Sequence, residues 1–255
     1  MADPAPPGAR PVPAILFPAC DEAEALPGVL AEFRAFFPPG TAHLIVGVNG
    51  SRDRTADVAA AAGAMVASTA SRGYGHGCMA AIGLAEGLEP QPEVYAFAAA
   101  DGATDPRDVG RVIERVMAGY DLVLGEREST PANRPVLGRG RSRGNRILAR
   151  WAGALTGVRF RDLGPVRAIR AEWIARIAPR EMHLGWTIEM QVRAARLGAR
   201  IAEIPVSERP RTAGSQKVSG GSALRSLRIG WAIAAAGWAA AARGRSDGSS
   251  TGVRS

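Results

Sequence analysis

Short apolar runs that alternate with helical patterns constrain the fold of this chain more than any other feature. The runs cover residues 14–17, 44–48, 65–67, 94–98 and 122–124, and helical spacings lie between them. A repeated strand–helix–strand order predicts a mostly parallel sheet covered by helices. In such sheets ligands bind beyond the carboxyl ends of the strands. We therefore expect an α/β fold whose site is built from the loops that follow the strands.

The length and the remaining patterns predict one domain with a helical extension. The chain has 255 residues, 46% of them hydrophobic, enough for one α/β domain with its own core. The first helix is expected at residues 21–37, and the second half adds a helix at 187–197 and a strand at 200–206. We expect a disordered lead-in over 1–12, the domain over 13–222, an amphipathic helix over 223–243 and a disordered tail over 244–255.

The charge of the chain is basic and comes almost entirely from arginine. The formal net charge is +8, and Lys217 is the only lysine. A basic surface suits nucleic acid, anionic lipid headgroups or phosphorylated substrates. Nucleic-acid binding usually adds stacking aromatic side chains, and residues 209–221 contain none. The sequence therefore argues against a nucleic-acid partner.

Cysteine content and hydropathy indicate the cellular compartment of the protein. Cys20 and Cys78 provide neither a disulfide framework nor a CxxC site, which favours a reducing compartment. The sequence shows no signal peptide, and no apolar run reaches the roughly 18 residues that a transmembrane helix needs. We expect a cytoplasmic protein that is soluble or peripheral to the membrane.

Polar loops after the predicted strands allow a structural and a functional interpretation. Asp101 and Asp105 either form a turn or hold a divalent cation through oxygen ligands. The glycine-rich loop 73–77 is either a tight turn or a place where backbone amides and Arg72 approach a diphosphate. This loop follows the third strand and lacks the dinucleotide spacing, so an NAD site is rejected.

Other motifs leave few alternatives for catalysis. The chain has no GxxxxGK[ST] phosphate loop and no GxSxG elbow. Its three histidines show no metal-ligand spacing. The segment 209–221, which carries Arg209, Arg211 and Lys217, is either a solvated linker or a phosphate-binding loop.

Taken together, these segments resemble the family 2 glycosyltransferases with a GT-A fold. The similarity is greatest to the branch of polyprenyl- and dolichyl-phosphate sugar synthases, and it extends over about residues 14–235. The matching segments are 18–26, 49–56, 72–75, 100–106, 121–125, 144–146, 155–157, 162–167, 186–191 and 215–220. Their order and spacing carry the resemblance, since each motif alone is weak.

The resemblance implies a nucleotide-diphosphate sugar as donor, a membrane lipid phosphate as acceptor, and Mg²⁺ or Mn²⁺ as cofactor. It assigns the nucleotide to Cys20, Glu22, Asn49, Ser51, Arg72, Gly73 and Asp101. It assigns the acceptor phosphate to Arg167, Trp186, Arg209, Arg211 and Lys217. The metal ligands implied are Asp101 and Asp105, and the catalytic residues are Asp101 and Glu189.

Two positions depart from the family pattern at the donor site. Ala99 stands where the first acid of an Asp-x-Asp motif is usual, and Val48 stands where an aspartate often precedes the Asn-Gly-Ser turn. Either the donor or metal arrangement differs, or activity is reduced; the alternative is a GT-A-like protein that acts on another acceptor or serves as a non-catalytic binding protein. A lipid phosphate is already ionised near neutral pH and needs no general base, whereas a hydroxyl acceptor would need a carboxylate such as Glu189.

The C-terminal helix is the candidate membrane contact. Two arginines, Arg225 and Arg228, share a face, and an apolar face is formed by Leu224, Leu227, Trp231 and Trp238. A basic helix that carries tryptophan can lie in the interface of an anionic membrane. The alternative is a helix that packs on the domain. We expect the helix to lie in the membrane interface, at the inner face of the cell membrane.

Overall fold

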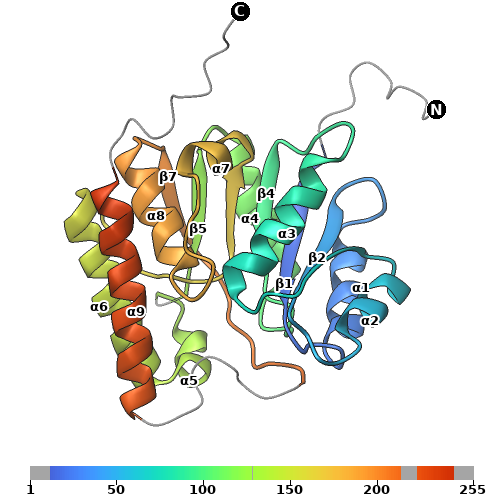
Figure 1. The fold of residues 1–255 in the computed structure, drawn as a ribbon, viewed down its shortest axis with the longest axis horizontal. Helices are drawn as coiled ribbons and strands as arrows, with labels where there is room; N and C mark the ends of the chain where they lie inside the picture. The colour runs from blue at the N-terminus through green and yellow to red at the C-terminus, as the bar shows by residue number, and fades with distance from the viewer. Residues whose placement is uncertain (1–11, 128, 214–222, 244–255) are drawn as a thin grey trace, which may run out of the picture.

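The computed structural model describes residues 12–127, 129–213 and 223–243, and a seven-stranded sheet forms its centre (Figure 1). The strand order is β3-β2-β1-β4-β6-β5-β7. The strands are β1 (Ala14–Ala19), β2 (His43–Asn49), β3 (Met65–Thr69), β4 (Val94–Phe97), β5 (Leu122–Glu126), β6 (Arg167–Arg170) and β7 (Ile201–Pro205). All neighbouring pairs are parallel except those of β6, which runs antiparallel to β4 and β5.

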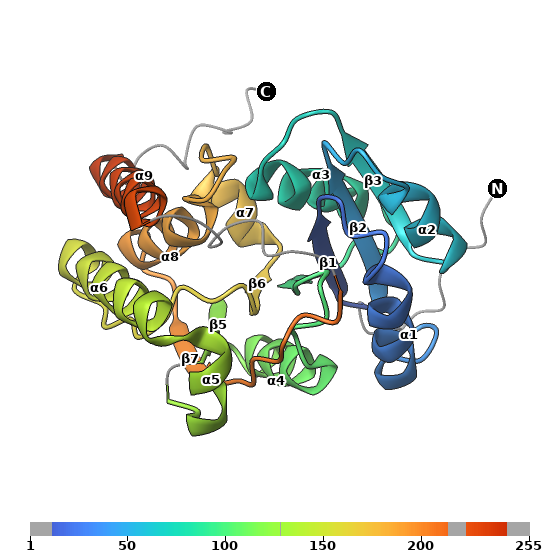
Figure 2. The same ribbon diagram turned by 90° about the horizontal axis from the view of Figure 1, so that it is seen from below.

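Helices cover both faces of the sheet, as the view along it shows (Figure 2). One face carries α1 (Leu26–Phe36), α2 (Thr55–Ala61) and α4 (Pro106–Met117). The other carries α3 (Tyr74–Glu86), α6 (Arg139–Thr156), α7 (Glu172–Ile177), α8 (Trp186–Arg196) and α9 (Ala223–Ala242). A 3₁₀ turn η1 (Pro131–Asn133) and the short α5 (Arg134–Leu137) precede α6. This is the GT-A arrangement, so the expected fold class is confirmed.

The buried strands explain why the apolar runs predict this sheet. In β1, Ile15 and Phe17 pack into one hydrophobic cluster while Leu16 packs into the other. A strand with helices on both faces must be apolar on both, which produces a continuous apolar run rather than an alternating one. The five strands predicted in the first half are all present.

Three local predictions were wrong or incomplete. The first helix begins at Leu26 rather than at residue 21, because Asp21 adopts a left-handed backbone with φ of 53° and ends β1 in a turn. Pro27 then lies in the first turn of α1, where a missing N–H has no cost. The strand β6 and the helix α7 were not predicted, since both are short and rich in arginine or flanked by it.

The C-terminal helix packs on the domain and also exposes tryptophan. A Cβ at Gly237 would lie 2.6 Å from the Trp151 ring of α6, which shows how closely α9 approaches that helix. Trp231 and Trp238 are nevertheless 76% and 64% exposed. The side chains of residues 223–228, and with them the two arginines and two leucines predicted to flank this face, lie outside the description.

Within the described parts of the chain, no helix has both the length and the apolar composition required to cross a bilayer.

Candidate active site

The loop after β1 is fastened to the loop after β2 by hydrogen bonds. The Asp21 N–H donates to Ser51 Oγ at 3.0 Å, and the Arg52 N–H donates to Asp21 Oδ1 at 2.6 Å. The Glu22 N–H donates to Thr55 Oγ1 at 3.0 Å. The parallel pairing of β1 and β2 brings their carboxyl ends to one edge, and these bonds fix the two loops against each other there.

Arg72 lies across both loops. Its Nε donates to the Gly50 carbonyl oxygen at 3.1 Å, its Nη2 contacts Cys20 Sγ at 3.3 Å, and it forms an ion pair with Asp21. The nearby Cys20 and Asp21 raise the pKa of Arg72. Gly50 has a positive φ of 61°, and a Cβ there would lie 2.5 Å from Arg72 Cγ. The Asn-Gly-Ser turn is therefore shaped to let this arginine pass over it.

The glycine-rich loop 73–77 serves close packing. A Cβ at Gly75 would lie 2.6 Å from Met182 Cα, and one at Gly77 would lie 2.7 Å from Asn49 Oδ1. Gly73, with φ of 150°, starts α3 against the same segment around Met182. Gly77 lets the first turn of α3 approach β2 and the buried Asn49 at the end of that strand, while the other two glycines let it approach the segment around Met182.

Asp101 lies in the turn after β4 and is joined to the basic segment that follows β7. Its Oδ1 accepts from the Ala103 N–H at 3.0 Å, and its Oδ2 accepts from Arg211 Nη1 at 2.7 Å. Arg211 Nη2 also reaches both carboxylate oxygens of Glu22, at 2.8 and 2.9 Å. The Thr212 N–H donates to the Asp101 carbonyl at 3.0 Å, so backbone and side chain both hold the segment in place. Arg211 thus bridges the ends of β1 and β4.

Asp105 and Arg209 form a second bridge beside the first. Asp105 caps α4 by accepting from the Arg107 N–H at 2.9 Å, and Arg209 Nη2 contacts it at 2.5 Å. Burial alone would raise the pKa of Asp105, but the hydrogen bond from Arg209 outweighs it and the pKa is lowered. Arg209 also reaches Glu32 of α1 at 2.6 Å. Two arginines that we assigned to phosphate are therefore engaged with carboxylates, while Lys217 lies outside the described residues.

Asp101 and Asp105, which we expected to hold a cation together, have separate partners. Each carboxylate is engaged by one arginine and one backbone N–H. Among the residues that the structure describes, no group of three His, Cys, Asp or Glu side chains is arranged to hold a metal ion. Mg²⁺ is usually held by one or two carboxylates together with substrate phosphates and water, rather than by protein ligands alone. The described residues by themselves therefore form no cation cage, and Arg211 is a positive charge that contacts both Glu22 and Asp101.

Sequence reasoning missed a buried network beside these bridges. Arg127, which follows β5, makes a bidentate ion pair with Asp162: its Nε and Nη2 lie 2.8 and 3.0 Å from the two carboxylate oxygens. Arg127 also contacts Glu208 at 3.2 Å. Asn145 of α6 donates to Asp162 at 2.6 Å. Burial would raise the pKa of Asp162, but the charge of Arg127 outweighs it and the pKa is lowered. The segments 121–125 and 162–167 matched the family pattern, yet residues 35 positions apart carry no periodic signal that would pair them.

Three other predicted site residues are placed away from the bridges. Glu189 accepts from the N–H groups of Arg180 and Glu181 and forms an ion pair with Arg243 at the end of α9. Arg167 is buried and donates to the Thr187 carbonyl at 3.0 Å. Buried Trp186 packs edge-on against a phenylalanine of β4. Their described contacts join secondary-structure elements and do not connect to Asp101.

Comparison with known proteins gives the family. Residues 14–171 match the family model described as Glycosyl transferase family 2. A dolichyl-phosphate hexose transferase of Haloferax volcanii is 32% identical over 216 residues, which cover 83% of this chain and 90% of the relative. An undecaprenyl-phosphate mannosyltransferase of Micrococcus luteus is 30% identical over 81% of this chain and 87% of the relative.

A solved structure supports the fold alone. The glucosyl-3-phosphoglycerate synthase of Mycobacterium tuberculosis, crystallised with Mn²⁺, UDP-glucose and phosphoglyceric acid, superposes with a TM-score of 0.70. It is 17% identical, and the match covers 91% of this chain and 80% of that one. With the strand-end loops, the GT-A sheet and the family match together, the chain belongs to glycosyltransferase family 2.

Proposed function

We propose that this glycosyltransferase moves a sugar from a nucleotide-diphosphate sugar to a polyprenyl phosphate in the membrane. The observation that carries the proposal is Arg211 held between Glu22 and Asp101, at the edge where the sheet's loops converge. The two curated relatives described above are named for lipid-phosphate substrates, which supports the same class of acceptor.

The donor half of the site is assigned to the loops after β1 and β2. Glu22, Asn49 and Ser51 offer hydrogen-bonding groups to a nucleoside, and Arg72 presents a half-exposed guanidinium beside them. The Mn²⁺ that accompanies UDP-glucose in the mycobacterial synthase belongs to that protein. In this chain we assign the charge opposite the diphosphate to Arg211.

The reaction needs charge stabilisation more than proton transfer. The bond between the anomeric carbon and the diphosphate oxygen breaks, and the nucleoside diphosphate leaves with the electron pair. A fixed guanidinium stabilises the negative charge that develops there. An oxygen of the lipid phosphate forms the new bond to the anomeric carbon, and because it is already ionised it loses no proton.

The contacts of Glu189 support an ionised acceptor over a hydroxyl. A hydroxyl nucleophile would require a carboxylate free to take its proton. Glu189, the candidate for that role, is occupied by two backbone N–H groups and by Arg243. A lipid phosphate makes no such demand.

The acceptor requires a contact with the bilayer, which we assign to α9. Trp231 and Trp238 are seven residues apart on the helix and both are exposed. Tryptophan side chains favour the membrane interface, and basic residues favour anionic lipid. We propose a peripheral position at the inner face of the cell membrane.

Transfer assays test the acceptor and the donor together. The protein is incubated with labelled UDP- and GDP-sugars and either a polyprenyl phosphate or the matching polyprenol in detergent. The proposal expects label in the lipid fraction only with the phosphate. Equal labelling of the polyprenol, or no nucleotide release from any donor, would contradict it.

Vesicle flotation tests the membrane contact. The double variant Trp231→Ser/Trp238→Ser should float with anionic vesicles less than the wild type does. Phe36→Ser/Met117→Ser is the matched control, because those apolar side chains are 44% and 46% exposed on α1 and α4. If both variants lose flotation equally, the contact is not specific to α9.

A further inference from the structure

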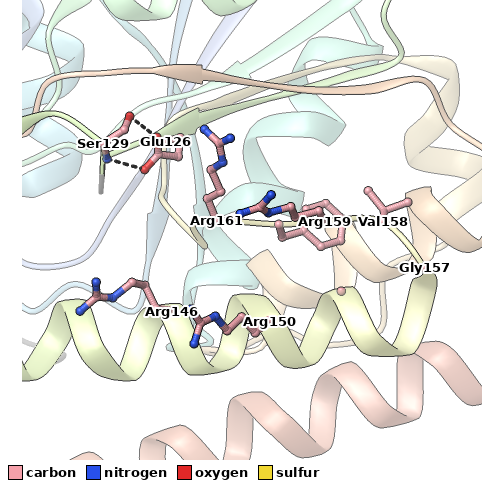
Figure 3. A pocket seen from close by; sticks show the side chains of 10 residues that line it. Glu126, Ser129, Arg146, Arg150, Gly157, Val158, Arg159 and Arg161 are labelled. Carbon is pink, nitrogen blue, oxygen red and sulfur yellow. Dashed lines mark hydrogen bonds between the residues drawn. The ribbon is translucent and has the colours of Figure 1, made fainter.

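A cavity of about 600 Å³ lies between α6, the segment that follows it and the end of β5 (Figure 3). Gly157 ends α6 in a left-handed conformation with φ of 75°, which turns the chain back along the helix. A Cβ at Gly153 would lie 2.9 Å from the Val158 carbonyl, so helix and returning segment are in close contact at one end. The returning segment is held in place by the Arg161 N–H, which donates to Glu203 of β7 at 3.0 Å. The cavity is therefore a built feature of the fold.

Four arginines line this cavity from two walls. Arg146 and Arg150 are one helical turn apart and rise from α6 toward the returning segment (Figure 3). Arg159 and Arg161 flank the buried Phe160, so both project away from the hydrophobic cluster that holds its ring. We call Arg146, Arg150, Arg159 and Arg161 the arginine cluster.

Within the described part of the chain, the arginine cluster has no ion-pair partner. Glu126 is the carboxylate in the lining, and it is buried and bonded by both the N–H and the hydroxyl of Ser129. Among the described residues no ion pair or hydrogen bond engages the side chains of the cluster. Elsewhere in this structure the arginines near the site are paired with acids, as Arg127 and Arg211 are. Four guanidinium groups around one cavity, none of them paired with a described residue, match an anion that carries several oxygens, such as phosphate.

The cavity is separate from the proposed donor site. Asp101 follows β4, whereas Glu126 ends β5, and β6 lies between those strands. Two interstrand spacings amount to about 10 Å. Glu126 also shares the sheet face of Leu124, which packs with α6. The cluster thus faces the outside of the domain on the α6 side.

The surroundings of the cluster indicate a lipid as the source of the phosphate. Ile147, next to Arg146 on α6, is 62% exposed. The neighbouring helix α9, packed on α6, carries the exposed Trp231 and Trp238. An exposed apolar side chain on a helix that forms one wall of a cationic cavity is typical of surfaces that bind anionic bilayers.

We propose that the arginine cluster binds the phosphate headgroup of an anionic membrane lipid and orients the enzyme on the bilayer. This site deepens the proposed function, because it assumes that the enzyme acts at a membrane, but it takes no part in the transfer itself. It is distinct from the position of the reacting lipid phosphate. Arg146 and Arg150 form its helical wall, and Arg159 and Arg161 form the other.

The test compares Arg146→Gln/Arg150→Gln with Arg115→Gln/Arg143→Gln, full-length proteins of identical net charge. Arg115 and Arg143 are exposed but do not line the cavity. Flotation is measured with phosphatidylcholine vesicles that contain phosphatidylglycerol, and with pure phosphatidylcholine. An arginine near an anionic surface contributes about fivefold in affinity, so we expect about thirtyfold weaker binding for the cavity pair. A thermal melt establishes that both variants are folded, and Arg159→Gln/Arg161→Gln provides an independent pair.

Each outcome bears on the proposal. If the cavity and control pairs lose vesicle binding equally, binding depends on diffuse surface charge, and the proposal is overturned. Binding of inorganic phosphate by the wild type without binding to anionic vesicles overturns the lipid assignment. A raised KM for a detergent-solubilised acceptor in the cavity pair overturns the separation from the reacting site. Absence of any transfer by the wild type would instead count against the proposed function and would leave the vesicle result intact.

Discussion

Arg211→Met removes a guanidinium that contacts two carboxylates while keeping a side chain of similar length. Arg211 lies 2.7 Å from Asp101 and 2.8 Å from Glu22, and the three side chains are 22%, 17% and 9% exposed. Breaking a buried ion pair by removing one partner costs about 3–5 kcal/mol, and some water reaches this site. We therefore expect a loss of about 3 kcal/mol in the free energy of unfolding, measured by urea denaturation.

The same substitution should change the response to divalent cations. Without Arg211, the carboxylate of Asp101 loses its arginine partner and presents its charge to the site, where it attracts a divalent ion. Wild-type binding of UDP or GDP, measured by calorimetry, should be insensitive to EDTA. Binding by Arg211→Met should fall by roughly ten- to a hundredfold in EDTA, the loss expected for a charged contact of about 1.5–3 kcal/mol, and should recover in part with Mn²⁺.

A matched control and a refuting result complete this test. Arg111→Met removes an arginine that pairs with Asp108 at 2.8 Å and contacts the Pro205 carbonyl, but touches neither Glu22 nor Asp101. It should leave nucleotide binding unchanged. If wild-type binding collapses in EDTA, or if Arg211→Met takes up no more Mn²⁺ than the wild type by electron paramagnetic resonance, Arg211 does not take the place of a cation.

Three further outcomes follow from the contacts at and around the site. The pKa of Asp162 is lowered in the folded protein, so its ion pair with Arg127 stabilises the fold above pH about 4. This stabilisation is lost as the pH falls through the folded pKa. Asp162→Asn should therefore make the free energy of unfolding depend less on pH in the acid range. Donor nucleotide should protect the partly exposed Cys20 from alkylation. Cys78 should stay unreactive with and without nucleotide, because burial raises the pKa of its thiol. Labelling of Cys20 at an unchanged rate would place the donor elsewhere. Glu189→Gln should cost about 3 kcal/mol of stability with kcat unchanged, and a large fall in kcat for the folded variant would restore Glu189 as a base.

The local sequence determined the framework of this protein. The apolar runs predict the parallel strands because a strand that helices cover on both faces of the sheet has apolar side chains on both faces. The same order places Glu22, Asn49 and Asp101 at one edge, since the carboxyl ends of parallel strands meet there. The sequence also showed that Ala99 stands where the family usually has an acid, and hence that the proposed donor site departs from the family pattern.

Secondary structure that depends on neighbours could not be predicted in this way. The strand β6 is four residues long with an arginine at each end, and no periodicity marks it. It becomes a strand because it fits between β4 and β5 and pairs with both. The helix α7 likewise follows from its docking beside β6 and α8, where Trp173 and Ile174 are buried.

The partners of the arginines were decided only by the tertiary structure. Arg211 meets Asp101, 110 positions earlier, and Glu22, 189 positions earlier, while Arg146 and Arg150 meet no acid at all among the described residues. Composition identifies all of them as the same basic residue type. Whether an arginine lies between two acids, as Arg211 does, or faces a cavity depends on which strand ends and helices the fold brings within about 3–4 Å. Charge-assisted hydrogen bonds form only at that range.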